Sequence, residues 1–323
     1  MPERDKKRAR ICNWFCMLDC LWMYQVWLEE LQDIHIQDTT VCTVLPFSIH
    51  LILVLEHLKH GELQSYLRQR APTVTYIIQE TPKTLVEKQH KVSLASCNGR
   101  PVLIKRTLYN KPEDLTYIYK CQHPYINTLL DVWYKSEKSF WLVLEYHELG
   151  NLEQYLRKQK KQSSVIPAEI MSQWMRQLLE AVAHMHELNV MHCDIKLPNI
   201  LVVNPSRLCI GDLGLAQHAN ADGVCEYLTG TPAYDAPELD YSNNSRESDM
   251  WCLGCVFLEA MTLVVATDVG CTAVRWVQNN VHVDNLDKVS HVYPAILRDM
   301  VCKCMQLAPQ MRPSAKDLLL TLA

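Results

Sequence analysis

The sequence lacks an excess of charge of either sign. Its 323 residues carry 32 lysines and arginines against 36 aspartates and glutamates, which gives a formal net charge of −4. Binding to nucleic acid or to an acidic membrane surface usually depends on a positive field. The balance therefore favours neither, and we expect no nucleic-acid partner.

The sequence also lacks a long uninterrupted apolar run. Residues 11–28 are rich in apolar and tryptophan side chains, but Asn13, Asp19 and Gln25 interrupt them. The stretch fits neither a membrane span nor a signal peptide. We expect an amphipathic helix that packs on the rest of the chain or on a partner. The basic residues before it form either a solvated tail or a nuclear-import patch: Arg4, Lys6, Lys7, Arg8 and Arg10.

The fourteen cysteines lack a clear metal-binding or disulfide pattern. Most are scattered through apolar runs, which is typical of buried thiols in a reducing compartment. The one Cys-x-x-Cys pair, Cys252 and Cys255, lies in an apolar helix-like segment, so we expect both side chains in the core. An intracellular protein, cytoplasmic or nuclear, is the location that this usage favours.

Three polar stretches stand out from this background, at residues 192–199, 211–214 and 230–238. The first combines Asp194, Lys196 and Asn199, and the second supplies Asp212. Such a set suits phosphoryl transfer, in which an acid accepts a hydroxyl proton, a lysine offsets moving charge and carboxylate and amide oxygens hold metal. Any one stretch alone is more often a polar turn, but three in this order favour a site.

Together these stretches resemble the catalytic loop, the metal-binding Asp-Phe-Gly motif and the Ala-Pro-Glu motif of eukaryotic-type protein kinases. The resemblance covers residue 76 to the C-terminus and is denser in the second half. Asp249 and Arg312 also match the family. The forms of the first and third motifs resemble serine/threonine rather than tyrosine kinases.

The resemblance implies an α+β, two-lobed protein-kinase-like fold. We expect an N-terminal extension at 1–75, a small β-rich lobe at 76–149 and a larger, mainly helical lobe at 150–323. Residues 91–96 and 101–106 predict a hairpin around Asn98-Gly99, and the apolar spacing of 170–188 predicts a buried helix. In the extension, residues 53–68 repeat the spacing of 142–157, which suggests a partial copy of the kinase hinge.

The resemblance also implies roles for individual residues in an enzyme that uses ATP and Mg²⁺ to phosphorylate Ser/Thr hydroxyls of protein substrates. Asp194 accepts or orients the hydroxyl proton, Lys196 stabilises transferred charge and Thr231 seats the substrate. Asn199 and Asp212 hold metal. The nucleotide-binding set is Lys105 on the phosphates, its helix partner Asp114, and around the adenine Val92, Leu103, Glu145, His147 and Leu201.

Departures from the family lie mainly in the first half. The three glycines of the nucleotide-covering loop are replaced by Leu85, Glu87 and His90, where backbone N–H groups must come close to phosphate. Leu103 narrows the adenine slot, and Asp114 is one methylene shorter than the usual glutamate. These changes keep open an alternative, a pseudokinase that signals by contact and binds ATP weakly or not at all. A third reading is a tandem-kinase remnant whose first unit regulates the second.

Cys193 replaces the arginine that in the family meets a phosphate on the activation loop. Without that partner, switching by loop phosphorylation loses its main contact. We therefore expect activity that does not depend on phosphate at Thr229 or at nearby residues. In the same loop region, Glu238 and Arg312 match a pair that ties the loop's end to the late helices.

Overall fold

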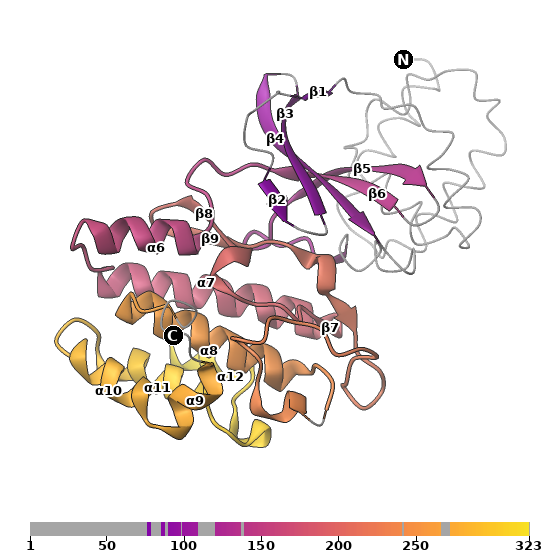
Figure 1. Cartoon of the computed structure of the whole chain (residues 1–323). Coiled ribbons are helices and arrows are strands. Elements are labelled where there is room, and N and C mark those ends of the chain that lie inside the picture. Colours follow the sequence, from indigo (N-terminus) through magenta and orange to yellow (C-terminus); the bar gives the residue numbers. More distant parts are fainter. Residues whose placement is uncertain are drawn as a thin grey trace, which may run out of the picture. The chain divides into compact units, whose positions relative to one another are not determined.

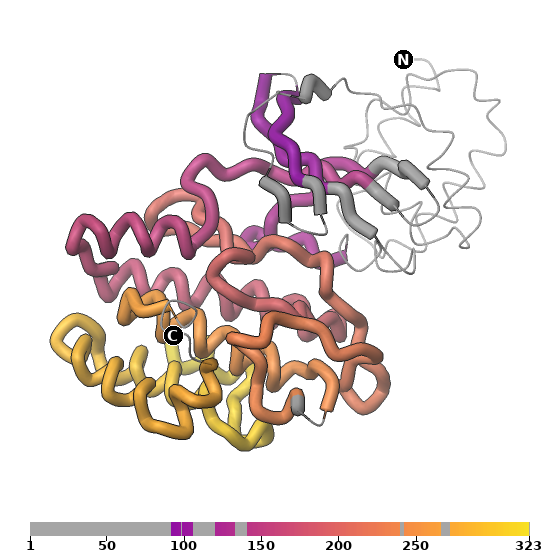
Figure 2. The backbone as a smooth tube through the Cα atoms, viewed as in Figure 1, coloured from indigo at the N-terminus to yellow at the C-terminus, as the bar shows by residue number. Residues whose placement is uncertain are grey.

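The computed structural model describes residues 76–78, 85–87, 90–97, 99–108, 120–136, 139–240, 242–265 and 272–322 (Figures 1 and 2). The expectations for residues 1–75, namely the amphipathic helix and the hinge-like repeat, lie outside these residues, and so does Asp114. The proposed boundaries at 75 and 149 stay predictions. No helix in the described part of the chain has the length and apolar character needed to cross a bilayer.

An antiparallel sheet of six strands forms the first part of the described chain, in the order β1-β3-β4-β6-β5 with β2 also paired to β3. The predicted hairpin is confirmed, because Cys97 pairs with Arg100 and Gly99 has the positive φ, +79°, that a two-residue turn needs. The strands are β1 (Tyr76–Ile78), β2 (Leu85–Glu87), β3 (His90–Cys97), β4 (Arg100–Leu108), β5 (Leu129–Ser136) and β6 (Ser139–Glu145).

Helices dominate the chain after residue 150 (Figure 1). The helix predicted over 170–188 is present as α7 and buries Trp174, Leu178, Val182 and Met185 at helical spacing. Helix α8 is buried along most of its length, and it includes Cys252 and Cys255, as expected. The helices are α6 (Leu152–Lys161), α7 (Ala168–Glu187), α8 (Arg246–Thr262), α9 (Ala273–Gln278), α10 (Val281–Lys288), α11 (Ala295–Cys304) and α12 (Ala315–Thr321).

Four short strands hold the loops that carry the polar stretches. Strand β7 (Val190–Met191) pairs with β10 (Gln217–His218), and β8 (Ile200–Asn204) pairs with β9 (Arg207–Ile210). Residues 192–199 therefore join β7 to β8, and residues 211–216 join β9 to β10. The Ile210 carbonyl accepts the Asn127 N–H at 2.7 Å, which ties this region to the segment that enters β5. The predicted fold class, a small strand-rich part followed by a larger helical part, is confirmed.

Candidate active site

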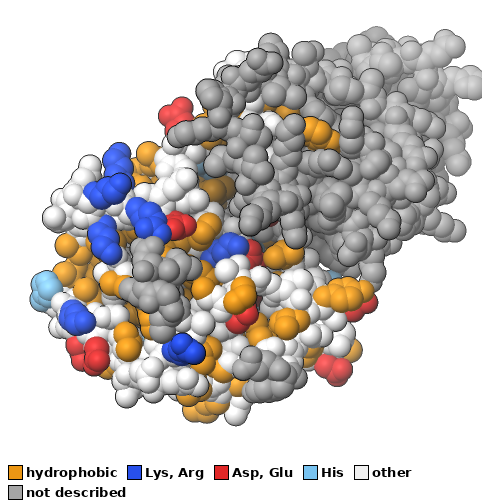
Figure 3. All heavy atoms as spheres, viewed as in Figure 1, with side chains coloured by type: hydrophobic (Ala, Val, Ile, Leu, Met, Phe, Trp, Pro, Cys, Tyr) orange, Lys and Arg blue, Asp and Glu red, His pale blue; other side chains and the backbone are white. Residues whose placement is uncertain are grey.

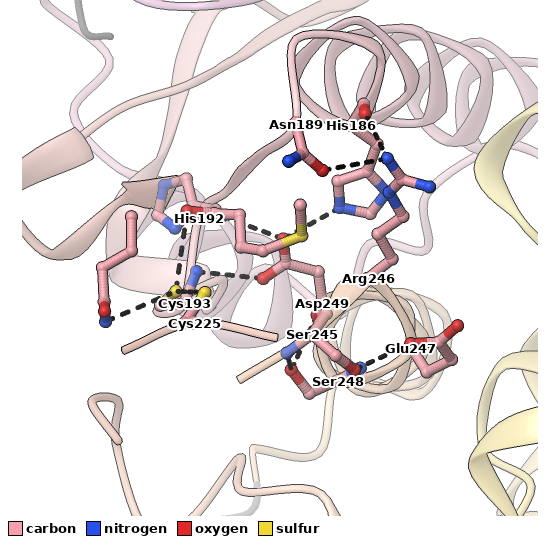
Figure 4. Close-up of polar contacts among 12 residues, drawn as sticks. His186, Asn189, His192, Cys193, Cys225, Ser245, Arg246, Glu247, Ser248 and Asp249 are labelled. Atoms are coloured by element: carbon pink, nitrogen blue, oxygen red, sulfur yellow. Dashed lines mark hydrogen bonds and ion pairs between the residues drawn. The ribbon is translucent and has the colours of Figure 1, made fainter. Parts of the chain in front are cut away.

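Helix α8 begins with a capping box that aims one carboxylate at the loop 192–199. The Ser245 hydroxyl accepts the Ser248 N–H, and the Ser248 side chain accepts the Ser245 N–H. This start places Asp249 in the first turn, where the helix dipole favours an anion. Figure 4 shows Asp249 facing the loop from this helix end.

Asp249 fixes the backbone at the start of the loop. It is 1% exposed and accepts the N–H of His192 at 2.9 Å and of Cys193 at 3.0 Å, with the His186 ring 3.0 Å from the same carboxylate (Figure 4). Cys193 has a φ of +65°, an uncommon conformation for a residue with a side chain. The two bonds from Asp249 hold the loop in that conformation.

His192 connects the loop to the second polar stretch. Its Nδ1 accepts the Asp194 N–H at 3.2 Å, so the ring proton lies on Nε2, which donates to the Gly211 carbonyl at 3.0 Å. The ring is completely buried. The His192 ring thereby holds Asp194 and Gly211, the residue before Asp212, in a fixed relation.

Asp194 lies at the centre of a compact polar network. The Thr231 hydroxyl donates to its Oδ1 at 2.6 Å, and the Lys196 Nζ lies 2.8 Å from its Oδ2. Lys196 also donates to the Thr231 hydroxyl at 2.8 Å. The structure thus brings together three of the predicted catalytic residues, although Thr231 follows Asp194 by 37 positions. Asp194 is 8% exposed, so little water competes for these bonds.

Asn199 turns its amide oxygen away from this network. Its Nδ2 donates to the Asp194 carbonyl at 2.8 Å and to the Asp194 Oδ2 at 2.9 Å. Because both partners only accept, the amide must present its nitrogen to them. Within the described residues its Oδ1 has no hydrogen-bond partner, and an amide oxygen is one of the ligand types that hard cations prefer.

Lys105 and Asp212 meet across the two parts of the fold. The Lys105 Nζ, on strand β4, lies 2.5 Å from the Asp212 Oδ1. Burial acts to raise the pKa of the Asp212 carboxyl, but the charge and hydrogen bond of Lys105 outweigh it and hold that pKa below its usual range. A Cβ at Gly214 would lie 3.0 Å from the same carboxylate oxygen, so glycine leaves room for the pair. Among the described residues the Asp212 Oδ2 has no partner.

The predicted adenine-side residues lie on strands around the end of β6. Leu103 on β4 pairs with Leu94 and with Leu144, and Val92 pairs with Lys105. Leu201 on β8 bridges to Asn151. The side chains of Val92, Leu103 and Leu201 are partly buried.

Glu145 is the last residue of strand β6, and His147 follows two residues later in a different environment. The Glu145 side chain is exposed and accepts the Thr128 hydroxyl at 3.3 Å. The His147 ring is buried 3.0 Å from the Asn127 amide oxygen, and burial lowers its pKa, so it is neutral at pH 7. In the described part of the chain the backbone N–H of His147 has no hydrogen-bond partner, which leaves it available to a ligand.

A model of the protein kinase domain matches residues 100–321 of the sequence. The chain belongs to the protein kinase family. The match includes strands β4 to β6 of the sheet, the helical part and all the polar stretches just described.

Serine/threonine kinases are among the curated proteins similar to this kinase chain. It is 29% identical to the serine/threonine-protein kinase Nek3 of Oryza sativa subsp. japonica over 64% of its own length, and 28% identical to Nek4 of Mus musculus over 64%. Nek11 of Mus musculus is 32% identical over 58%. The chain spans only 35%, 26% and 30% of these three relatives, respectively.

The chain from residue 225 to residue 238 is called the activation segment below. The expected ion pair between the end of this segment and the late helices is present. Arg312 forms a two-point ion pair with Glu238, at 2.6 and 2.7 Å, and its guanidinium lies 5.0 Å from the centre of the Trp251 ring. Both charged side chains are almost fully enclosed. This pair anchors residues 230–238 to the α8 and α12 region.

Three amide side chains that the sequence motifs did not single out also contact the activation segment. They are Gln217, Asn243 and Asn244, and each bonds to the backbone between Cys225 and Thr229. No motif spacing marks them, because an asparagine or glutamine in a polar loop is usually solvated. The only available signal was the position of Gln217 shortly after the Asp-Leu-Gly stretch.

Proposed function

We propose that this chain is an ATP- and Mg²⁺-dependent protein kinase that transfers the γ-phosphoryl group to Ser/Thr hydroxyls of protein substrates. The observation that carries the proposal is the joined network of Asp194, Lys196 and Thr231, with Asn199 bonded to the same carboxylate. The Lys105–Asp212 pair supports it by supplying charge from the other part of the fold. Phosphoryl transfer depends on positioning and electrostatics more than on covalent chemistry, and these contacts provide both.

The residues present fit a magnesium–nucleotide complex. Asn199 Oδ1 and Asp212 Oδ2 are oxygen ligands without partners among the described residues, and magnesium in such sites takes one or two protein oxygens and fills its shell with phosphate and water. The described chain holds no cluster of three His, Cys, Asp or Glu ligands, which agrees with a metal that arrives with its nucleotide. When bound, magnesium offsets charge on the β- and γ-phosphates.

The chain's own side chains act on the substrate hydroxyl and the phosphates. Asp194 orients the substrate hydroxyl and accepts its proton. Its Oδ1 already accepts a hydrogen bond from the Thr231 hydroxyl. Lys196 stays within reach of the transferred charge. Lys105 donates a hydrogen bond to Asp212 Oδ1, and phosphate oxygens of the nucleotide can take the place of this acceptor.

The nucleotide lid is the weak point of the proposed enzyme. Hairpin β2–β3 forms with Glu87 opposite His90, so the backbone pairs without the family's glycines. The sequence has Leu85, Glu87 and His90 where the family has glycine, and any residue with a Cβ is less suited than glycine to bring its backbone N–H close to phosphate. We therefore expect a raised KM for ATP with the transfer chemistry retained.

The first test is the transfer of radiolabelled γ-phosphate to a generic protein substrate with and without magnesium. The proposal predicts magnesium-dependent labelling on serine and threonine. The same assay with all divalent ions chelated gives the background. Absence of labelling at several millimolar ATP, with magnesium present, would contradict the proposal.

The same hairpin supports a second candidate, a pseudokinase that acts as a binding scaffold. A thermal-shift titration with Mg-ATP separates the two. An enzyme that binds nucleotide gains stability with the logarithm of its concentration, about 3 kcal/mol at 100 times the dissociation constant. No shift at several millimolar Mg-ATP favours the scaffold.

Substrate identity is proposed only as a class, proteins that present Ser/Thr hydroxyls. An intracellular location, cytoplasmic or nuclear, is likewise a proposal, and it is supported by the buried free thiols of the described residues, Cys121, Cys209 and Cys304 among them.

A further inference from the structure

At the position that carries the phosphate-binding arginine in related kinases, this chain has a cysteine in a closed, buried cluster. Cys193 is buried with Met191, Ala219 and Cys225, and its Sγ lies 3.8 Å from the Cys225 Sγ (Figure 4). The hydrogen bond with Cys225 and burial raise the pKa of the Cys193 thiol, so it is protonated at neutral pH. Among the described residues the charged side chain that acts on the Cys193 thiol is the Asp249 carboxylate, so a phosphate dianion placed there would lose water without meeting a positive charge.

A neutral amide takes over the contact with the activation segment. Gln217 lies on strand β10 opposite Met191, so its backbone is fixed beside the start of the catalytic loop. Its Nε2 donates to the Tyr227 carbonyl at 2.9 Å, and its Oε1 accepts the Tyr227 N–H at 3.0 Å. Nε2 also lies 3.1 Å from the Thr229 hydroxyl oxygen. The side chain thus binds Tyr227 as a neighbouring strand would bind it, through both backbone groups.

Two further amides hold the segment from the other side. The Asn244 Oδ1 accepts the Thr229 N–H at 2.9 Å, and its own carbonyl accepts the Cys225 N–H at 2.8 Å. The Asn243 Nδ2 donates to the Cys225 carbonyl at 3.1 Å. Asn244 is 3% exposed, so its bonds are sheltered from water.

Gln217, Asn243 and Asn244 together are called the amide clamp below. The residues that they bind lie directly before Thr231, which contacts Asp194. Gly230 follows Thr229 with a φ of +146°, and a Cβ there would lie 3.1 Å from the Cys193 carbonyl. The next residue, Thr231, reaches Asp194 and Lys196. The place of Thr231 therefore depends on where Tyr227 and Thr229 are held.

We propose that Gln217 is a positioning residue that keeps the activation segment in its substrate-binding arrangement without a phosphate. It acts through Tyr227, Thr229 and then Thr231, and it does not touch the reacting atoms. The proposal rests on the kinase function proposed above. It implies an enzyme that is active as synthesised, with its segment held by neutral hydrogen bonds that salt screens little.

The test compares Gln217→Ala with the matched variant Gln173→Ala, which removes an exposed glutamine from α7. We expect Gln217→Ala to lower kcat/KM for a protein substrate at least tenfold, with the KM for ATP within twofold of wild type and a melting temperature within a few degrees. Gln173→Ala leaves all three unchanged. A Gln217→Ala enzyme with wild-type kcat/KM for the protein substrate overturns the proposal.

Hydrogen exchange gives a readout that does not need activity. In wild type the Tyr227 N–H is bonded by Gln217, so Gln217→Ala speeds exchange of the peptide 225–231 at least tenfold while peptides from α7 stay protected. Unchanged exchange of 225–231 contradicts the clamp. If the wild-type chain transfers no phosphate but this peptide still loses protection, the kinase proposal fails and the clamp survives.

A swap of partners distinguishes positioning from simple loss of stability. Gln217→Arg removes the amide, and adding Thr229→Glu offers that arginine an acidic partner. We expect Gln217→Arg to be impaired and the double variant to recover at least a third of wild-type kcat/KM. Thr229→Glu in the Gln217→Ala background provides no such recovery. Equal activity of the two double variants argues against a positioning role.

Discussion

Arg312 and Glu238 show how burial decides the weight of a single ion pair. Both side chains are enclosed, two hydrogen bonds join them, and the guanidinium also donates to the carbonyls of Glu247 and Gln306. An exposed pair such as Arg157 with Glu153 on α6 has similar distances but remains in water. Removing one partner of an enclosed pair leaves a buried charge unpaired, whereas solvent replaces the partner of an exposed one.

Glu238→Gln is therefore expected to lower the free energy of unfolding by about 3 kcal/mol. The substitution removes the Glu238 carboxylate, while the charge of Arg312 stays buried. Urea unfolding followed by tryptophan fluorescence measures the change. Glu153→Gln is the control, with an expected loss below about 1 kcal/mol. Similar losses for both variants would show that burial does not set the contribution of these pairs.

Among the elements, the activation segment is the one that carries Thr231, which bonds to Asp194 and Lys196. Its backbone between Cys225 and Thr229 bonds to three amides from two other segments, Gln217 and the pair before α8. The Thr229 hydroxyl supplies one of several contacts, at 3.1 Å from Gln217. A residue whose side chain makes only replaceable neutral bonds, to Gln217 and Cys193, is a poor candidate for an obligatory phosphorylation switch.

Thr229→Ala is expected to keep turnover within about fivefold of wild type, since it loses only neutral hydrogen bonds, to Gln217 and Cys193, with a net cost of about 1 kcal/mol. Steady-state kinetics with a protein substrate measures this. Phosphatase-treated wild-type enzyme is the companion sample and is expected to match untreated enzyme. A near-total loss in the alanine variant would refute independence from phosphate.

Helix α8 meets the end of α11 at a point where only glycine fits. A Cβ at Gly254 would lie 2.7 Å from the Cys304 Cβ and 2.8 Å from the Met305 side chain. In an open helix, Gly→Ala is favourable by about 1 kcal/mol. At Gly254 the same substitution is expected to be destabilising, because the added methyl group would overpack the contact between the helices.

Gly254→Ala is expected to destabilise the folded chain by about 2 kcal/mol, because the two helices must separate or their side chains leave preferred rotamers. Chemical denaturation measures it. Gln173→Ala on the open face of α7 serves as control and should change stability by less than about 0.5 kcal/mol. A stabilised Gly254→Ala variant would mean that the helices do not pack this closely.

For the whole molecule, the sequence predicted the parts that follow from periodicity and from motif order. The hairpin around Gly99, helix α7 and the fold class came from such patterns. The meeting of Thr231 with Asp194 followed from resemblance rather than from spacing. The amide clamp could not be predicted, because Gln217 and Tyr227 meet only through the course of a loop, which has no periodicity.

The drawn face of the helical part has a mixed surface. Figure 3 shows basic, acidic and hydrophobic side chains interspersed on the drawn face of the helical part, without one large field of a single sign. This agrees with the small net charge.

Because of its buried thiols, the free energy of unfolding of the whole molecule is expected to decrease at alkaline pH. Burial raises the pKa of Cys121, Cys209 and Cys304 from 9.0 to about 12. The folded state then favours the protonated thiols, while the unfolded chain ionises near pH 9. The stabilising contribution is complete below pH 9 and is lost as the pH rises from 9 towards 12.

Stability is therefore expected to fall between pH 9 and pH 11, and Cys304→Ala should reduce that slope by about 1 kcal/mol per pH unit. Urea unfolding at each pH measures both. The comparison of slopes removes the shared effects of lysine and tyrosine ionisation and of the cavity. Identical slopes for wild type and variant would show that the Cys304 thiol ionises as easily when folded.

The central claim concerns chemistry at one carboxylate, and Asp194→Asn tests it most directly. The amide keeps the shape and retains an oxygen for Thr231, while Lys196 is partly exposed, so the melting temperature should stay within a few degrees. Loss of the proton acceptor should lower phosphate transfer at least 100-fold. An Asp194→Asn protein that melts like wild type and still transfers phosphate at the wild-type rate would contradict the account.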